Sequence, residues 1–232
     1  WTGIYFDNIP IKIQAVPAIG YQFVRWEGID SDEIEVEFIP QEDIEIKAVF
    51  ESRENWGQAV INEIYFDVPG EMGGDAIYEF VELHNPGTST YSLSGHSFDN
   101  GISFTFPAGS GISAGSYVVI ARDASAYDNL TVPIFEWTSG KLSNSGEALV
   151  LKNAIGSVID SLYYKSNQPW PKGSNGTGYS IELSVPYANN SIPEQWHRSY
   201  TSGGTPGSFN SIYQAESQLV INELYAGDSA WF

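Results

Sequence analysis

Three glutamates lie on or near neighbouring strands that the sequence predicts. They are Glu63, Glu79 and Glu82. Two of them could converge across these strands and act as an acid–base pair. General acid–base catalysis needs one group that donates a proton and one that accepts it, so a hydrolase using Glu63 and Glu79 is one alternative. Glu63 recurs, however, as Glu223 in a repeated segment. Repetition within a scaffold strand favours a structural role, in which the carboxylate accepts hydrogen bonds from the backbone or a neighbouring loop.

A second group of carboxylates suggests calcium. Asp67, Glu71 and Asp75 surround a Gly-rich loop, and oxygen-rich loops of this kind wrap hard cations. The spacing of these residues lacks the Asp-x-Asp-x-Asp-Gly pattern of a dedicated calcium loop. A solvated acidic turn is therefore the preferred interpretation, and calcium is the only cofactor for which the sequence gives any ligands.

Aromatic side chains would be able to bind glycans by stacking on sugar faces. Trp137, Trp170 and Trp196 fall in predicted loops, and Trp170 stands between Pro169 and Pro171. A carbohydrate-binding module that uses these three tryptophans is a further alternative. Large aromatics more often fill the core of a β-sandwich, so the structural role is preferred here too.

Other catalytic patterns lack their required context. His84, His96 and His197 are widely separated, whereas zinc needs three or four converging ligands. The Gly-x-Ser-x-Gly pattern at residues 111–115 precedes a Val-rich strand, whereas a nucleophile elbow precedes a helix. The chain has no cysteine, which excludes disulfides, a thiol nucleophile and thiolate metal sites.

The charge of the chain excludes further classes of partner. Its 232 residues include 29 Asp and Glu against 10 Lys and Arg, a formal net charge of −19. Such a surface repels nucleic-acid phosphates and anionic membranes. No apolar run approaches the ~18–20 residues that span a bilayer. We expect no nucleic-acid partner and no membrane insertion, and strong acidity suits solubility outside a cell.

An internal repeat defines the organisation of the chain. The segment Val60-Ile61-Asn62-Glu63-Ile64-Tyr65 returns as Val220-Ile221-Asn222-Glu223-Leu224-Tyr225, and long-range self-similarity indicates tandem modules. We expect three parts: a small β unit at 1–51, a complete β module at 57–211, and at 212–232 a linker with the first strand of a truncated second module. Because that last strand lacks its own module, it is expected to pair with an exposed sheet edge, in cis or in another copy of the chain.

Period-two alternation and frequent Gly and Pro turns predict an all-β chain. The small unit shows strands at 11–16, 20–26, 34–38 and 44–50, which would form one four-stranded sheet. The larger unit shows strands at 60–65, 79–83, 103–106, 117–121, 148–151, 158–163 and 179–183. This spacing favours an immunoglobulin-like β-sandwich.

Residues 57–211 resemble the lamin tail domain along nearly their whole length. The matching motifs include Leu93-Ser94-Gly95, Phe104-Thr105-Phe106-Pro107-Ala108-Gly109 and Ser202-Gly203-Gly204-Thr205-Pro206-Gly207, in family order and spacing. One departure is His96, where the family usually has Trp. Residues 1–51 look like the C-terminal part of a bacterial B-repeat of the internalin type, carried by Trp26-Glu27-Gly28 and Ala48-Val49-Phe50-Glu51.

The pairing of these two units is similar to accessory regions of secreted bacterial proteins, including those with a spore-coat-H-type kinase domain. The resemblance implies a non-catalytic structural or interaction module of a multidomain protein at the cell surface or outside the cell. Its partners would be proteins or extracellular polymers. Trp1 is not a natural start, so we expect the chain to be an excised piece.

Overall fold

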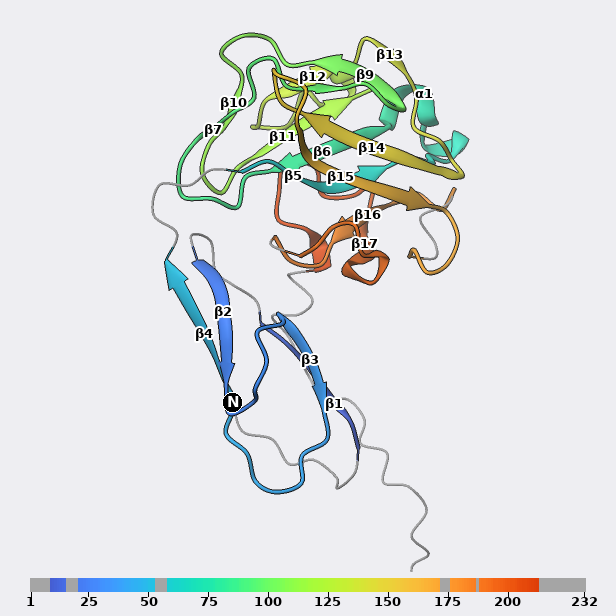
Figure 1. The fold of residues 1–232 in the computed structure, drawn as a ribbon. Helices are drawn as coiled ribbons and strands as arrows, with labels where there is room; N and C mark the ends of the chain where they lie inside the picture. Colours follow the sequence, from blue (N-terminus) through green and yellow to red (C-terminus); the bar gives the residue numbers. More distant parts are fainter. Residues whose placement is uncertain (1–8, 16–20, 53–57, 172–175, 187, 213–232) are drawn as a thin grey trace, which may run out of the picture.

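The structure, a computed structural model, describes residues 9–15, 21–52, 58–171, 176–186 and 188–212 (Figure 1). The repeated strand at residues 220–225 lies outside the described residues. The described chain is almost entirely β, as the sequence predicts. It comprises a small N-terminal unit, drawn in the lower part of Figure 1, and a larger sandwich, drawn above it.

The small unit forms its four strands close to the predicted positions. They are β1 (Ile11–Gln14), β2 (Tyr21–Glu27), β3 (Glu35–Phe38) and β4 (Lys47–Ser52). They pair as two antiparallel ribbons, β1 with β3 and β2 with β4, and this replaces the expected single sheet. Periodicity in a sequence shows which residues share a face, but it does not determine which strands are neighbours.

A few aromatic side chains hold the small unit together. Phe23 lies 5.3 Å from Trp26 and 6.1 Å from Phe50 between ring centroids. The Trp26 indole is buried, and its N–H donates to the Glu33 carbonyl at 2.9 Å. A single apolar layer of this size buries little surface, so the unit has a much smaller core than the sandwich.

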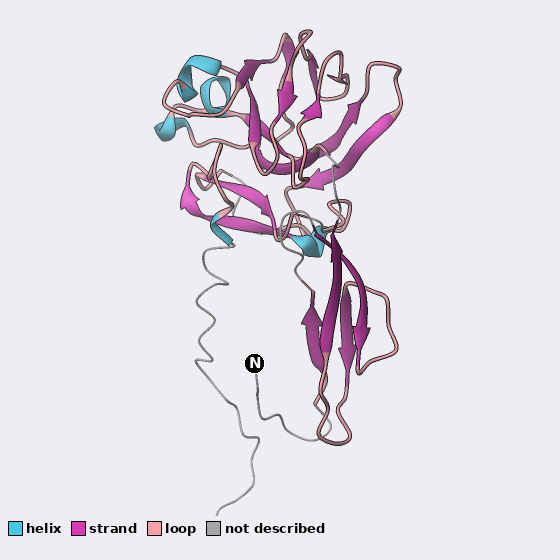
Figure 2. Cartoon of the chain, turned by 90° about the vertical axis from the view of Figure 1, so that its left-hand side faces the viewer, coloured by secondary structure: helices cyan, strands magenta, loops and turns pink. Residues whose placement is uncertain are grey.

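The larger unit is a sandwich of two sheets and a short ladder (Figure 2). The six-stranded sheet has the order β12-β11-β6-β5-β16-β17, and the five-stranded sheet has the order β13-β9-β8-β14-β15; β7 and β10 form the ladder. The strand bounds are as follows: β5 Val60–Tyr65, β6 Phe80–His84, β7 Tyr91–Ser92, β8 Ser97–Phe98, β9 Ile102–Thr105, β10 Gly111–Ile112, β11 Tyr117–Ala121, β12 Ile134–Glu136, β13 Ser139–Gly140, β14 Gly146–Lys152, β15 Val158–Lys165, β16 Tyr179–Leu183 and β17 Trp196–Ser202.

The central strands of the six-stranded sheet are buried on both faces. The inner face of the sheet meets the second sheet across the main core, where Ile64, Val81 and Ile120 pack with Leu149 and Leu151. Every residue of β5, β6 and β11 is buried. This burial explains why β5 and β6 carry such apolar sequences and why polar residues among them must find internal partners.

A second, smaller apolar cluster covers part of the outer face of this sheet. It contains Tyr65, Phe80, Val119 and Tyr127. Short helical turns border it: η1 (Gly70–Met72), α1 (Asp75–Tyr78) and η2 (Ala124–Tyr127), with η3 (Pro193–Gln195) before β17. None of the helices in the described ranges is long and apolar enough to cross a membrane.

Candidate functional site

A row of three buried glutamates crosses the outer face of the six-stranded sheet. Glu82 of β6 pairs in register with Glu63 of β5, and Glu63 pairs in register with Glu182 of β16. All three residues have an exposed fraction of 0%. Like charges directly opposite each other on neighbouring strands destabilise a sheet. This glutamate row therefore requires compensating hydrogen bonds or bound protons.

Several of the compensating donors come from residues 203–212, which we call the C-terminal loop. Each glutamate accepts one backbone N–H from this loop: Thr205 donates to Glu63 at 2.9 Å, Gly207 to Glu82 at 2.5 Å and Ile212 to Glu182 at 3.2 Å. The loop begins inside the Ser202-Gly203-Gly204-Thr205-Pro206-Gly207 motif, whose first residue ends β17. The glutamate row thus fastens the end of the module to its central strands, as the structural interpretation of Glu63 predicted.

Two asparagines extend the same network. Asn62 donates from Nδ2 to Glu82 Oε1 and to Asn210 Oδ1, both at 2.8 Å. Asn210 donates to the Leu183 carbonyl at 2.9 Å. Both side chains are buried, so each amide joins the C-terminal loop to the sheet without access to solvent.

Burial raises the proton affinity of Glu63 and Glu82. Desolvation first, and the charge of Glu182 second, raise the pKa of Glu63 from 4.5 to about 8, against the lowering effect of hydrogen bonds from Ser180 and Thr205. Desolvation and then the charge of Glu63 also raise the pKa of Glu82 well above its ordinary value. A buried carboxyl group without a cation keeps a proton more readily than an exposed one.

Glu79, the second member of the suggested acid–base pair, lies in a different environment. It immediately precedes β6 and is fully buried. Its Oε2 atom accepts hydrogen bonds from Arg122 Nη1 at 3.0 Å and from the backbone N–H of Leu142 at 3.4 Å. Its Oε1 atom has no donor among the described residues. Burial raises the pKa of Glu79 to about 7, although Arg122 opposes the shift. Glu63 and Glu79 therefore contact different elements and do not form a pair.

The Arg122–Glu79 ion pair gives a stability prediction. Replacing Arg122 by methionine is expected to cost about 2 kcal/mol at pH 8, because a buried carboxylate loses its only cation. At pH 5.5 the cost should be smaller, because below a pKa of about 7 Glu79 carries a proton and needs no cation. Urea unfolding at the two pH values measures both.

The matched control is Lys152→Met. Lys152 pairs with Asp99 at 2.7 Å, but the Asp99 side chain is 53% exposed. Exposed pairs contribute less than about 1 kcal/mol. If the two variants lose equal stability, or if the loss at Arg122 does not depend on pH, the role assigned to the Arg122–Glu79 pair is wrong.

The suggested calcium ligands come together only in part. Asn144 Nδ2 donates to Asp67 Oδ1 at 2.8 Å and to Asp75 Oδ2 at 3.0 Å, so one amide joins two carboxylates. Burial and then the charge of Asp75 raise the pKa of Asp67. Glu71 is exposed on η1. Within the described ranges, no three acidic or histidine side chains lie together as metal ligands would. A calcium site at these residues stays a prediction.

The three tryptophans suggested for glycan stacking belong to the core. Trp137, Trp170 and Trp196 have exposed fractions of 5%, 3% and 2%. Trp170 packs on Trp196 at 5.8 Å, and the Trp196 N–H donates to the Asn190 carbonyl at 2.8 Å. This burial agrees with the structural role that the sequence favoured for them, and a glycan site at these residues stays a prediction. A large ring gains more from burial between two sheets than from exposure, even when its local sequence resembles a loop.

The histidines also have structural partners. His84 stacks on Tyr117 at 4.4 Å, and burial lowers its pKa to about 4. His96 Nε2 lies 3.2 Å from the Tyr91 hydroxyl, while His197 is exposed. The serine of the Gly-x-Ser-x-Gly pattern lies in a turn between β10 and β11, where the Ser116 N–H donates to the Ser113 carbonyl at 3.0 Å.

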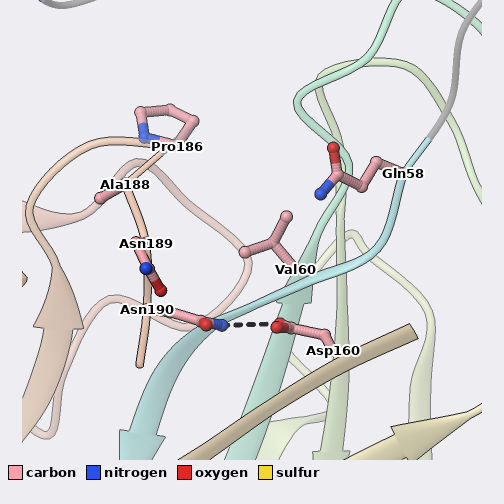
Figure 3. A pocket seen from close by; sticks show the side chains of 7 residues that line it. All are labelled: Gln58, Val60, Asp160, Pro186, Ala188, Asn189 and Asn190. Atoms are coloured by element: carbon pink, nitrogen blue, oxygen red, sulfur yellow. Dashed lines mark hydrogen bonds between the residues drawn. The ribbon is translucent and has the colours of Figure 1, made fainter. Parts of the chain in front are cut away.

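A polar cavity of about 320 Å³ is lined by residues at the start of β5, by Asp160 of β15 and by residues that follow β16 (Figure 3). Asp160 and Asn190 face each other across its floor, joined at 2.6 Å, while Gln58 and Asn189 stand at opposite sides. Asp160 also accepts the Ile61 N–H at 2.7 Å. This carboxylate therefore ties β15 of one sheet to β5 of the other, and its hydrogen-bonding capacity is largely used internally.

A larger and more apolar cavity of about 620 Å³ lies on the outer face of the six-stranded sheet. One wall consists of side chains from β5, η1, α1 and η2, and the other is the C-terminal loop with the end of β17. Gly204 lines this cavity and also packs directly against the Glu63 carboxyl group. The glutamate row thus holds one wall of the cavity in place. Neither the sequence motifs nor the alternation pattern identified this cavity.

The two packed sheets define an immunoglobulin-like β-sandwich module. Residues 53–166 match the family model of the Lamin Tail Domain, which confirms the lamin tail resemblance of this segment. The match ends after β15, whereas β16, β17 and the C-terminal loop complete the six-stranded sheet in space. The chain matches no curated protein. The B-repeat and spore-coat-H resemblances stay predictions.

Proposed function

We propose that the chain is a non-catalytic spacer and docking module of a multidomain secreted or cell-surface bacterial protein. The main support is the glutamate row. Glu63 and Glu82, which the sequence offers as acid–base candidates, accept hydrogen bonds from the C-terminal loop, and so does Glu182. These bonds hold the loop on the sheet. A lamin tail sandwich is an interaction fold, and interaction needs a rigid surface rather than converging reactive groups.

The hydrolase alternative has little support in this arrangement. The Glu63 carboxyl group accepts hydrogen bonds from Ser180 and Thr205. The Glu79 carboxyl group accepts hydrogen bonds from Arg122 and Leu142 instead. Neither glutamate is among the residues that line the two cavities described above. A general acid or base must reach its substrate within hydrogen-bonding distance, and a fully buried side chain cannot do so without opening the fold.

Docking through strands is part of the proposal. In the described part of the chain β15 pairs only with β14, so it forms an edge of the five-stranded sheet. Val158 and Tyr163 on this strand are 57% and 55% exposed. An edge of this kind accepts an added strand. The repeated segment at residues 220–225 would be a suitable strand, either from the same chain or from another copy.

The proposal is tested by incubating the labelled protein with isolated bacterial envelopes and measuring both retention and release of soluble products. We expect saturable retention and no turnover of peptide, ester or polysaccharide bonds. The variant Glu63→Gln keeps the shape of the side chain, and it should bind like the unchanged protein. Turnover that disappears in Glu63→Gln, with the fold preserved, would establish the hydrolase instead.

A further inference from the structure

The larger cavity has an apolar lining and receives no basic side chain from the described residues. Its larger apolar and aromatic side chains include Tyr65, Val68, Met72, Tyr78, Tyr127 and Leu130. A volume of about 620 Å³ lies within the range of ligand sites in proteins, roughly 300–1,000 Å³. Its walls come from segments far apart in the sequence, so the cavity exists only in the folded module.

The surroundings of this lining are acidic. Glu71 and Asp128 are exposed and directly adjacent in sequence to the lining residues Met72 and Asn129. Burial, then the charges of Asp75 and Asp67, raise the pKa of the Tyr65 hydroxyl to about 12. The negative charges of Asp67 and Asp75 are therefore felt at Tyr65, which lines the cavity. A cation in the cavity would be attracted by these two carboxylates and would reduce their mutual repulsion.

The basic side chains on neighbouring elements do not neutralise this field. Arg122 is held by Glu79 at 3.0 Å, and the Arg198 guanidinium lies over the Tyr179 ring at 4.2 Å. An aromatic wall and a negative field together favour an organic cation with an apolar body.

We propose that this cavity receives an arginine side chain from a basic segment of a partner protein. The aliphatic stem would pack on Met72 and Leu130, and the guanidinium would meet the tyrosine faces beside the acidic groups. This inference rests on the docking role proposed above and deepens it by naming the chemistry of the partner. The net charge of −19 adds long-range attraction for such a segment.

The test measures binding of a fluorescent five-residue peptide with a central arginine between two leucines. Its control has citrulline, the uncharged analogue, in place of arginine. We expect saturable one-site binding of the arginine peptide, with the citrulline peptide at least about tenfold weaker because the charge-dependent contacts are lost. Raising the salt from about 0.05 M to about 0.5 M should weaken only the arginine peptide.

Charge variants locate the site. Asn129 is exposed and lines the cavity, so Asn129→Lys should weaken the arginine peptide at least about threefold and Asn129→Asp should strengthen it. Ile155 is 87% exposed and lies outside the lining, so Ile155→Lys makes the same charge change elsewhere and should leave the affinity unchanged.

Three results would overturn this site: no binding of the arginine peptide, equal binding of the citrulline peptide, or equal effects of the two lysine substitutions. The last result would mean general attraction to an acidic surface. If the peptide fails while the protein still binds envelopes, only the cavity assignment is wrong. If both fail, the docking role itself is wrong.

Discussion

Replacing Gly204 by alanine is expected to destabilise the sandwich by about 4 kcal/mol. Gly204 has φ +81°, which costs a residue with a Cβ about 1–2 kcal/mol. A Cβ at this position would also lie 2.2 Å from Glu63 Oε1 and 2.8 Å from Ser180 Oγ. Both atoms are fully buried and hydrogen-bonded to each other, so they cannot move away without breaking the glutamate row. Overpacking of this kind typically costs a further 1–3 kcal/mol or so.

Gly203→Ala separates the two contributions. Gly203 has nearly the same backbone angle, φ +82°, but no atom lies within 4 Å of its added Cβ. It should therefore lose only the conformational part, about 1–2 kcal/mol. Urea unfolding followed by tryptophan fluorescence compares the two variants. Equal losses would show that the contact between the C-terminal loop and Glu63 contributes nothing, and the assigned role of the loop would be wrong.

The strands and the class of fold were predictable because they depend on local pattern. The apolar segment 117–121 and the alternating segment 179–183 coincide with β11 and β16. The repetition of Glu63 as Glu223 also predicted a scaffold role, and its hydrogen bonds to the C-terminal loop confirm that role. A repeated polar residue in an apolar strand is a useful signal, since such a residue must find a partner in every copy of the module.

Long-range pairing was not predictable from the same patterns. Glu182 joins Glu63 and Glu82 only because β16 lies next to β5, far away in the sequence. The C-terminal strand β17 was missed, since Trp196-His197-Arg198-Ser199 lacks alternation; in this strand Trp196 and Ser199 are buried and the residues between them are exposed. Trp137 and Trp170 lie outside the strands as predicted, whereas Trp196 begins β17.

The glutamate row shows that carboxylates on neighbouring strands can have a structural role in place of a catalytic one. Glu63 and Glu82 lie opposite each other on neighbouring strands, as an acid–base pair would. Both are buried, and both accept hydrogen bonds from the C-terminal loop. The Thr205 hydroxyl lies 2.8 Å from Glu182 Oε1 and 3.4 Å from Glu63 Oε2. One hydroxyl has one proton to donate, so it satisfies both carboxyl groups only when one of them carries a proton of its own. Burial raises the pKa of Glu63, which assigns this proton to Glu63.

The stability of the module should therefore fall as the pH rises from about 5 to about 9. The folded-state pKa of Glu63, about 8, exceeds its ordinary value of 4.5. The folded protein then binds this proton more tightly than the unfolded chain does. The resulting stabilisation is fully present below pH 4.5 and is lost as the pH rises through about 8, up to about 5 kcal/mol in total, since one pKa unit corresponds to about 1.4 kcal/mol. Glu82 and Glu79 shift in the same direction and add to the effect.

Glu63→Gln isolates the contribution of one carboxyl group from the general repulsion of a chain with a net charge of −19. The amide cannot ionise, so the slope of unfolding free energy against pH between about 5 and 8 should decrease by up to about 1.4 kcal/mol per pH unit, the value for one proton. Glu71→Gln removes an exposed carboxylate and should leave the slope nearly unchanged. If Glu63→Gln keeps the full slope, Glu63 is ionised in the folded protein. The row would then have to be stabilised by its hydrogen bonds alone, and Thr205 would donate to only one of the two carboxylates.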